Sequence, residues 1–434
     1  MFEKLTLLPN NGFDRIFIKT IKTMKERDIY PRVNPMVNAI TIYVAGKTPS
    51  ENNRAFKMSS NENPLGPSKK VILSMKEGYK GLERYPDTMQ TDIKTQVANV
   101  HNLKEENLVF GNGSDEFFHL VCSIFLSRGD ESIICEHGFL LYKSQILASG
   151  AVPVIIKETD GKIKVYDIIR AITDRTKLVF ITVPTNPTGT FLTLRELHLL
   201  RRILPTRIAL LIDSAYAEFV IDDRYNDGKA IYQKNIIMTR TFSKIYGLAA
   251  IRIGWMHADR EYIIASNKVR SPFNVNKIAQ MAGAIAINDP DSCWVSAKFN
   301  LFWITKIMWA LRKKKMLLHY SSANFVIIKA PKKVPIDIIE EYFEINGIIT
   351  RQIADYRLFN CIRTSLGPSN INNLLVDIII NIDNMKVKKT VFRTSTSSFT
   401  TYNLCKKIET TRYVGLYKML EAKYGKSQDS WVTT

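Results

Sequence analysis

The chain contains few cysteines, and they are scattered. Its 434 residues include five. They are Cys122, Cys135, Cys293, Cys361 and Cys405. No two of them stand at the close spacing that is typical of a zinc site or a disulfide framework. The sequence therefore predicts no metal site, no disulfide scaffold and a reducing, cytoplasmic location.

Long apolar runs are lacking as well. No run approaches the roughly 20 residues that a membrane-spanning helix needs. Residues 1–30 alternate charge with modest hydrophobicity and lack the contiguous apolar core of a secretory signal. The sequence thus argues against a membrane protein, while a hydrophobic content of 45% is ordinary for a globular one. The length allows one large domain and one smaller domain.

The charge is strongly basic, with 61 Lys and Arg against 41 Asp and Glu and a formal net charge of +20. Such an excess can serve to bind nucleic acid, since Lys and Arg neutralise phosphates. The basic residues are spread along the chain, however, and no helix-turn-helix or zinc pattern stands beside them. The balance therefore favours small anionic substrates over nucleic acid as partners.

The most informative segment of the chain is Thr241–Trp255. It places Lys244 directly after two hydroxyl side chains, Thr241 and Ser243, and eight residues before Arg252. A lysine can form a Schiff base with the aldehyde of pyridoxal phosphate (PLP), whose phosphate needs hydroxyl donors and a guanidinium. Taken alone, the segment also fits an ordinary surface loop. Motifs upstream of it favour the cofactor.

The first upstream motif surrounds Asp213. The apolar run Ile208–Ile212 predicts a buried parallel strand, and Asp213 stands at its carboxyl end. Ligands bind at that edge of open α/β sheets, where a carboxylate can pair with the protonated pyridine nitrogen. Tyr216 could donate a hydrogen bond to the phenolic oxygen of the ring. An aspartate that merely caps a helix is the alternative.

The second motif is Val183–Gly189, which follows the predicted strand Leu178–Val183. Its prolines and glycine end the strand abruptly and fix the backbone. Asn186 is therefore expected as a rigidly held amide at the same sheet edge, where it can bond the ring oxygen. As an isolated feature the segment also fits a plain turn.

The third motif is the glycine-rich turn Phe110–Glu116, which precedes an apolar helical stretch, Phe117–Leu126. Glycines let the backbone approach an anion closely, and free amides at a helix start bind phosphate. A plain helix cap fits the isolated turn equally well. The phosphate-binding candidates in this turn are Gly113, Ser114 and Asp115.

Together these residues resemble the histidinol-phosphate aminotransferases, a branch of the fold-type I PLP enzymes. The resemblance runs from about Pro31 to about Ile382. Further segments that carry it are Met58–Pro67, Arg84–Asp87, Pro272–Asn276, Ser322–Phe325 and Cys361–Arg363. It implies an α/β fold with a large domain, built on a mostly parallel sheet flanked by helices, and a smaller α+β domain. It also implies a homodimer that transaminates histidinol phosphate with 2-oxoglutarate in histidine biosynthesis.

By this resemblance, Lys244 carries PLP and moves the proton of the transamination, while Asp213 pairs with the ring nitrogen. Tyr216 and Asn186 bind the phenolic oxygen, and Phe139 stacks on the ring. The residues implied to hold the phosphate are Gly113, Ser114, Asp115, Thr241, Ser243, Arg252 and, from the neighbouring subunit, Tyr85.

The resemblance also implies a substrate site. Arg363 would grip the α-carboxylate of an amino acid or keto acid in a bidentate pair. Arg351 and Tyr43 would contact the distal part of the substrate, which is the phosphate when the phosphorylated amino alcohol is bound. Asn63 is expected to line the same pocket.

The expected domains are a large PLP-binding domain, 60–289, and a small domain formed by 31–59 and 290–384. An N-terminal extension, 1–30, and a basic, Ser/Thr-rich tail, 385–434, lie outside the resemblance. Strands are expected near Phe325–Lys329 and Cys361–Ser365. For the tail, a loosely ordered appendage and a degraded reading frame both stay open.

Three departures from the family pattern keep alternatives open. Ser214 replaces an acidic residue, Met89–Ile93 replaces a typical Leu-Arg pair, and the helix-like stretch Cys293–Leu318 has no glycine where relatives turn into the next strand. An aromatic amino acid aminotransferase and a degenerate, non-catalytic PLP-binding copy therefore remain alternatives. A threonine-phosphate decarboxylase fits less well, because Thr241–Trp255 and Pro272–Asn276 resemble aminotransferases.

Overall fold

The computed structural model describes residues 33–49, 55–331 and 334–384, so the predicted extension and tail lie outside the described residues. By its internal contacts the chain divides after Thr41, and the two parts are described separately. The described residues of the first part hold helix α2 (Pro35–Asn38). The side chain of Asn34 caps this helix by accepting the amide of Met36 at 3.0 Å.

In the described residues of the second part, a central sheet has seven strands in the order β2-β8-β7-β6-β5-β3-β4. The strands are β2 (Leu108–Gly111), β3 (Glu131–Cys135), β4 (Val152–Ile156), β5 (Thr176–Thr182), β6 (Ala209–Asp213), β7 (Ile236–Thr241) and β8 (Gly254–His257). β8 runs antiparallel to both of its neighbours, and the other paired strands are parallel. The predicted mostly parallel sheet is confirmed.

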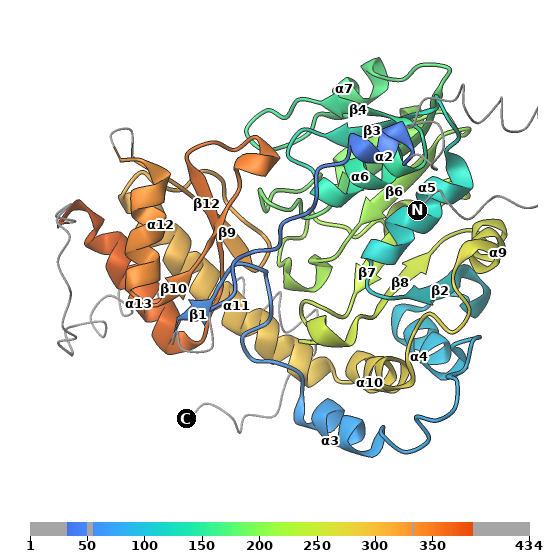
Figure 1. The fold of residues 1–434 in the computed structure, drawn as a ribbon, viewed down its shortest axis with the longest axis horizontal. Helices are drawn as coiled ribbons and strands as arrows, with labels where there is room; N and C mark the ends of the chain where they lie inside the picture. The colour runs from blue at the N-terminus through green and yellow to red at the C-terminus, as the bar shows by residue number, and fades with distance from the viewer. Residues whose placement is uncertain (1–32, 50–54, 332–333, 385–434) are drawn as a thin grey trace, which may run out of the picture. The chain divides into compact units, whose positions relative to one another are not determined.

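Both faces of this sheet are buried under helices (Figure 1). Along β5, Leu178 and Phe180 pack with α5 and α6, while Val179 and Ile181 pack with α7 and α8 on the opposite face. Because both faces are covered, the central strands are continuous apolar runs, which is the pattern that the sequence displayed. The helices are α3 (Lys69–Glu77), α4 (Thr91–His101), α5 (Asp115–Phe125), α6 (Leu140–Ala148), α7 (Val165–Arg170), α8 (Leu194–Ile203), α9 (Arg260–Val269) and α10 (Lys277–Ile287).

A smaller sheet lies beside the large one (Figure 1), and among the described residues it has three antiparallel strands in the order β11-β12-β9. The strands predicted at Phe325–Lys329 (β9) and Cys361–Ser365 (β12) are confirmed with those bounds. The remaining elements of this region are β11 (Arg351–Gln352), the parallel pair β1 (Phe56–Lys57) and β10 (Ile348–Ile349), and helices α12 (Ile336–Ile345) and α13 (Ser369–Ile380).

Helix α11 (Pro290–Lys313) connects the two regions. It begins with Pro290 in its first turn, where a missing amide hydrogen costs nothing. It ends at Lys313, earlier than the predicted Leu318. The chain then turns at Lys315, whose φ of +58° lies in the left-handed region that usually takes glycine. The turn after α11 is therefore made by a lysine in the left-handed conformation.

The buried apolar residues form separate clusters around the two sheets. One joins Met58 to α11, α12 and α13, and three others surround the large sheet. The large domain, 60–289, and the small domain, 31–59 with 290–384, stay a prediction, because the division of the chain by its internal contacts falls after Thr41.

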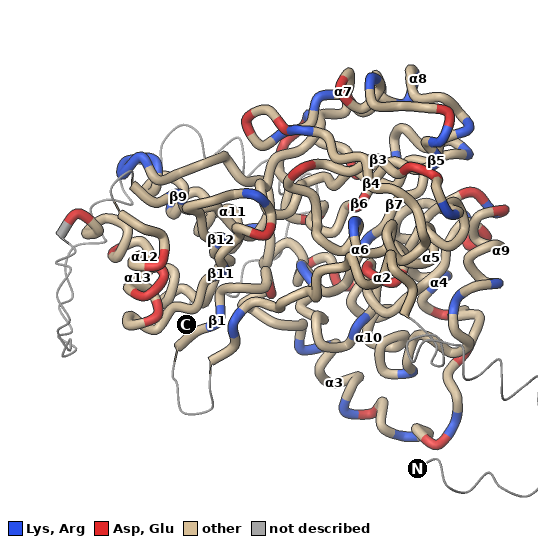
Figure 2. Tube along the Cα trace, turned by 45° about the horizontal axis from the view of Figure 1, so that its top comes forward, with Lys and Arg blue, Asp and Glu red and all other residues tan. Residues whose placement is uncertain are grey.

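Basic and acidic residues are interspersed over the described residues, with a basic run at Arg312–Lys315 (Figure 2). In the part of the chain that the structure describes, no helix is long and apolar enough to cross a membrane.

The close approach of β8 to the start of α5 generates a stability prediction. A Cβ added at Gly254 would lie 2.6 Å from the Ser114 amide nitrogen and 2.8 Å from the Arg240 carbonyl oxygen. Since both are backbone atoms, Gly254→Ala should lower the free energy of unfolding by about 1–3 kcal/mol. Urea unfolding at a fixed protein concentration measures the change. Ser123→Ala, on the exposed side of α5, is the control and should stay within about 0.5 kcal/mol of the wild type; a Gly254→Ala variant as stable as this control would contradict the prediction.

Candidate active site

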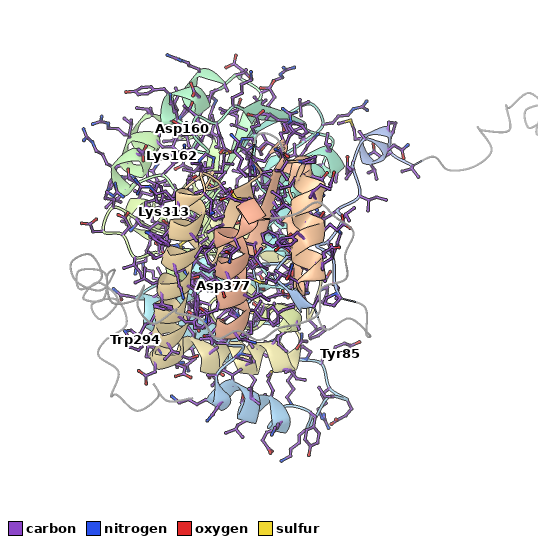
Figure 3. All side chains as sticks on the ribbon, turned by 90° about the vertical axis from the view of Figure 1, so that its left-hand side faces the viewer. Tyr85, Asp160, Lys162, Trp294, Lys313 and Asp377 are labelled. Carbon is purple, nitrogen blue, oxygen red and sulfur yellow. The ribbon has the colours of Figure 1, made fainter. Side chains whose placement is uncertain are left out.

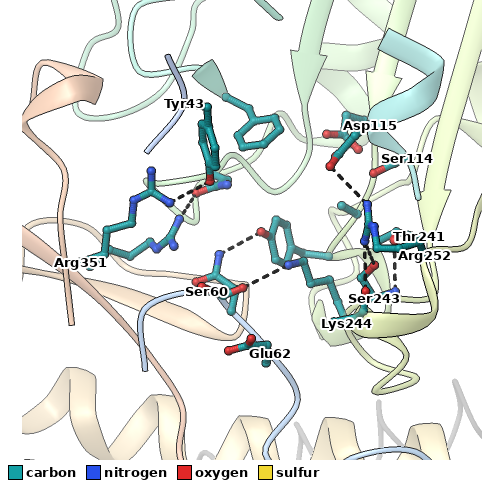
Figure 4. A pocket seen from close by; sticks show the side chains of 18 residues that line it. Tyr43, Ser60, Glu62, Ser114, Asp115, Thr241, Ser243, Lys244, Arg252 and Arg351 are labelled. Carbon is teal, nitrogen blue, oxygen red and sulfur yellow. Dashed lines mark hydrogen bonds and ion pairs between the residues drawn. The ribbon is translucent and has the colours of Figure 1, made fainter. Parts of the chain in front are cut away.

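A polar pocket lies at the carboxyl edge of β5, β6 and β7, beside the start of α5 (Figure 4). Except for Gly113, Asn63 and Tyr85, every site residue predicted from the sequence lines it. The lining residues that the sequence analysis did not single out are Ser60, Asn61, Glu62, Ala215 and Ala249. Segments far apart in the chain thus meet where the parallel strands end, as expected for this type of sheet.

Lys244 stands just after β7 and points into the pocket (Figure 4). Its Nζ donates to the carbonyl oxygen of Ser60 at 3.3 Å. Burial, together with the nearby guanidinium of Arg363, lowers the pKa of Lys244 to about 8. The neutral amine, which is the form that attacks a carbonyl carbon, is therefore more populated near neutral pH than it would be at the ordinary lysine pKa.

Asp213 ends β6 and is buried. Its Oδ2 accepts a hydrogen bond from the Tyr142 hydroxyl at 2.7 Å, and its Oδ1 accepts one from the Thr239 hydroxyl at 3.2 Å. Burial raises the pKa of Asp213 to about 6, although the bond from Tyr142 opposes the rise. A cationic ring N–H placed beside this carboxylate would favour its ionised form further.

The start of α5 and the segment after β7 form a cradle for an anion. Arg252 donates to the Ser243 hydroxyl at 3.2 Å and lies 3.4 Å from the Asp115 carboxylate. No side chain caps α5, so its first amides remain available to a ligand. Gly113 has a φ of +81°, and a Cβ there would collide with the guanidinium of Arg252. Glycine is therefore needed for the arginine to approach.

Tyr216 and Asn186 line the same pocket from the segments that follow the neighbouring strands β6 and β5. The Tyr216 hydroxyl oxygen accepts a bond from the Asn61 amide at 2.9 Å. The side-chain oxygen of Asn186 accepts one from Arg363 at 2.6 Å. Phe139, at the start of α6, also lines the pocket and packs edge-to-face with Tyr43 at 6.3 Å between ring centroids.

Two arginines reach the pocket from the small sheet, where Arg351 of β11 and Arg363 of β12 are paired across the strands. Arg363 is buried and donates to the Ser59 carbonyl at 2.7 Å, while its Nε has no hydrogen-bond partner among the described residues. Arg351 donates to the Tyr43 hydroxyl at 2.8 Å. A buried guanidinium with an unused donor suits a carboxylate ligand.

These groups fit PLP. The aldehyde requires a neutral amine, the ring nitrogen a carboxylate, and the phosphate a guanidinium with hydroxyls and free amides. The pocket offers Lys244 for the first, Asp213 for the second and Arg252 with Ser243 and Thr241 for the third. Arg363 lines the same pocket from the small sheet.

Besides Gly113, two predicted site residues lie outside the lining. Asn63 donates to the Ile245 carbonyl at 2.7 Å and to the Ser296 hydroxyl at 3.0 Å, so it braces the segment after Lys244 instead of facing the pocket. Tyr85 is 82% exposed and stacks on Phe273, with ring centroids 4.5 Å apart. Figure 3 shows Tyr85 at the periphery of the described residues.

Sequence reasoning missed several residues that hold the site together. Asn61 lies inside the segment Met58–Pro67, which carries the family resemblance, so that segment could have indicated a role for Asn61 in the site. Tyr142 stands one helical turn after Phe139 on α6, and no local pattern distinguishes it from a core tyrosine. Its bond to Asp213 depends on how α6 packs on the sheet, which only the tertiary structure reveals.

The departure at Ser214 has a structural explanation. Ser214 is buried, and its hydroxyl donates to the Asp227 carbonyl at 2.8 Å. The buried Arg240, on β7 next to Thr241, pairs with Glu218 at 2.7 Å and Asp227 at 2.5 Å. Acidic partners for this arginine therefore come from the loop after β6, and the absence of an acid at 214 leaves the lining of the pocket unchanged.

The lowered pKa of Lys244 leads to a pH prediction. Attachment of PLP to the apo-protein should accelerate as pH rises through about 8 and level off above it, because the neutral amine is the reacting form. In the wild type, the positive charge of Arg363 favours the neutral form of Lys244. Arg363→Gln removes this charge and should therefore move the midpoint to higher pH. Attachment is followed by borohydride reduction and mass spectrometry of the labelled peptide. Arg357→Gln, an exposed arginine outside the pocket, is the control and should leave the midpoint unchanged; a wild-type midpoint near 10.5 would contradict the prediction.

Comparison with known proteins agrees with this geometry. Residues 53–301 match the family model of aminotransferase class I and II. The histidinol-phosphate aminotransferase of Paracoccus denitrificans is 36% identical over 339 residues, which cover 77% of this chain and 91% of that protein. That of Dinoroseobacter shibae is 36% identical over 348 residues, with 80% and 96% covered. The crystal structure of histidinol-phosphate aminotransferase from Sinorhizobium meliloti in complex with pyridoxal-5'-phosphate shares the fold, with a TM-score of 0.73, 22% identity and coverage of 82% and 98%. The chain therefore belongs to the class I and II aminotransferases, PLP-dependent enzymes of fold type I, in the group of the histidinol-phosphate aminotransferases.

Proposed function

We propose that this protein transfers the amino group of histidinol phosphate to 2-oxoglutarate, giving imidazole-acetol phosphate and glutamate, as a step of histidine biosynthesis. The similarity to named histidinol-phosphate aminotransferases over most of the chain supports this substrate pair. The structural observation that carries the proposal is one pocket that joins Lys244, Asp213 and Arg252 to the paired arginines Arg351 and Arg363.

Each residue around the cofactor has a separate task in this proposal. PLP, when bound, supplies an electron-withdrawing ring that acidifies the Cα–H bond of the substrate. Asp213 keeps a proton on the ring nitrogen, and Tyr216 and Asn186 bind the phenolic oxygen. Lys244, as a neutral amine, takes the proton from the substrate Cα. Phe139 stacks on the ring. The phosphate is held by Thr241, Ser243 and Arg252 and by the turn residues Gly113, Ser114 and Asp115.

The substrates share the remaining space. Arg363 grips the α-carboxylate of glutamate or 2-oxoglutarate through a bidentate pair, to which its unused Nε contributes. Histidinol phosphate has no carboxylate, so its phosphate is bound by Arg351 and Tyr43 on the adjacent strand and segment. One pocket with two cationic ends therefore accepts both substrates in turn.

We also propose a two-fold homodimer in a reducing, cytoplasmic location. The dimer is supported by the exposed ring of Tyr85 and by further exposed apolar side chains close to it in the chain, Tyr79, Leu82 and Met89. A second subunit would cover such side chains. The location is supported by Cys122, Cys135, Cys293 and Cys361, which are buried and free among the described residues.

The division of labour between the arginines predicts opposite substrate effects. Arg363→Ala should slow the glutamate half-reaction far more than the histidinol-phosphate half-reaction, and Arg351→Ala should do the reverse. A charge-assisted hydrogen bond contributes about 1.5–3 kcal/mol, so each preferred loss should be roughly ten- to a hundredfold in the specificity constant. Single-turnover rates of both half-reactions in both variants measure the effect.

The same experiment tests the substrate assignment. Equal losses for both substrates in both variants would contradict the division of labour. If the wild type reacts rapidly with glutamate and phenylalanine but not with histidinol phosphate, the substrate is an aromatic amino acid instead. If the bound cofactor does not change its absorbance with any amino donor, the chain is a non-catalytic copy.

The proposed dimer predicts complementation between two defective subunits. Lys244→Ala removes the attachment point in its own pocket, and Tyr85→Phe removes a phosphate donor from the pocket of the neighbour. A mixed dimer of the two variants places both defects in one pocket and leaves the other intact. Co-expressed variants should therefore regain PLP affinity in up to half of the sites of the mixed dimer. In the control, Tyr79→Phe replaces Tyr85→Phe, because Tyr79 is an exposed tyrosine without an assigned cofactor role. Full PLP affinity in a Tyr85→Phe homodimer would contradict the assignment of Tyr85.

A further inference from the structure

Asn61 lies on the segment between β1 and α3 and is buried, with 1% of its surface exposed. Each of its polar groups has a partner. Its amide N–H donates to the Ser365 hydroxyl at 2.7 Å, and its carbonyl accepts from Asn324 at 3.0 Å. Its side-chain oxygen accepts from the Ser365 hydroxyl at 3.0 Å, and its side-chain nitrogen donates to the Tyr216 hydroxyl at 2.9 Å.

The Ser365 hydroxyl determines which way the Asn61 carboxamide points. This hydroxyl already accepts the backbone N–H of Asn61, so its own proton needs an acceptor. The side-chain oxygen of Asn61 provides that acceptor, which leaves the NH₂ group facing Tyr216. The opposite orientation would direct two donors at the serine and leave the serine proton without a partner.

This orientation also determines where the Tyr216 proton goes. The Tyr216 oxygen is the acceptor in its bond with Asn61, so its own proton cannot point at that residue. Tyr216 is buried and lines the pocket, and the pocket is the direction left for the proton. Its hydroxyl is thus set to donate to an oxygen of a ligand.

We propose that Asn61 is a positioning residue that aims the Tyr216 proton at the phenolic oxygen of PLP, under the control of Ser365 on β12. The inference rests on the proposed role of Tyr216. Arg363 lies two residues before Ser365 on the same strand, so both side chains project from the same face of β12. The strand that binds the substrate carboxylate therefore also sets the hydrogen bond at the cofactor.

The backbone of Asn61 allows clean variants. Its φ of +57° lies in the left-handed region, which asparagine, aspartate and glycine tolerate better than other residues. Asn61→Asp keeps the shape of the side chain but offers two acceptor oxygens, so Tyr216 must turn its proton toward position 61. Asn61→Gly keeps the backbone and removes the side chain altogether.

The test compares the PLP-loaded wild type, Asn61→Asp, Tyr216→Phe and the double variant by two measurements that need no substrate. These are the PLP dissociation constant and the pH at which the absorbance of the bound cofactor changes. Loss of a hydrogen bond to a charged oxygen should weaken PLP binding about tenfold and raise that pH by about one unit. Asn61→Asp and Tyr216→Phe should show the same shifts, and the double variant should show no more than either.

Additive shifts in the double variant would overturn the proposal, since they would mean that the new carboxylate acts only through its charge. The proposal would also be overturned if the absorbance of the bound cofactor changed at the wild-type pH in Asn61→Asp but at a shifted pH in Tyr216→Phe. Asn61→Gly should shift the titration less than Asn61→Asp, because the Tyr216 proton is no longer drawn away. If Asn61→Asp does not fold, Asn61→Gly and Ser365→Ala decide, and wild-type values in both count against the proposal. Failure of the wild type to turn over histidinol phosphate counts against the proposed function alone.

Discussion

The structure depends on one constraint, which is the placement of two cations, the half-buried Lys244 and the buried Arg363, in a single pocket. Neither has an ion pair among the described residues, and desolvation lowers the pKa of both. The backbone carbonyls of Ser59 and Ser60 accept from Arg363 and Lys244 respectively. Carbonyl dipoles satisfy the donors without neutralising the charge, so the pocket retains an attraction for anions. A carboxylate and a phosphate are what this environment stabilises best.

The segment around Ser59 therefore links the two sheets as well as the two cations. Ser60 contacts Lys244, which follows β7 of the large sheet, and Ser59 contacts Arg363 on β12 of the small sheet. Asn61 continues the same pattern by contacting Tyr216 and Ser365. Three consecutive residues thus join the cofactor side of the pocket to the substrate side. A displacement of β12 would alter the hydrogen bonds of Lys244 and Tyr216 together, because the joining segment is only three residues long.

The sequence predicted the fold and most of the lining because local chemistry carries both. The apolar runs of β5 and β6 are buried on both faces, and polar residues such as Asp213 and Asn186 must lie at the strand ends. The motif around Lys244 specifies its chemistry by residue type and spacing. Contacts that depend on packing between distant segments were not predictable in this way. Tyr142 reaches Asp213 only because α6 lies against the sheet, and Asn63 turns toward Ile245 although its motif suggested the pocket.

The cations behind the pocket and those in the pocket also differ in the partners that they have. Directly behind it, Arg240 has Glu218 and Asp227 as acidic partners, so this buried cation is fully ion-paired next to β7. In the pocket itself, Lys244, Arg351 and Arg363 donate to carbonyls, a phenol and an amide, and none of these three has an ion pair among the described residues. The arginine behind the pocket is therefore paired with acids, whereas these three cations of the pocket are not. An acidic residue introduced beside these three cations would pair with them within the protein. The pocket would then lose the attraction for anionic ligands on which the proposed reaction depends.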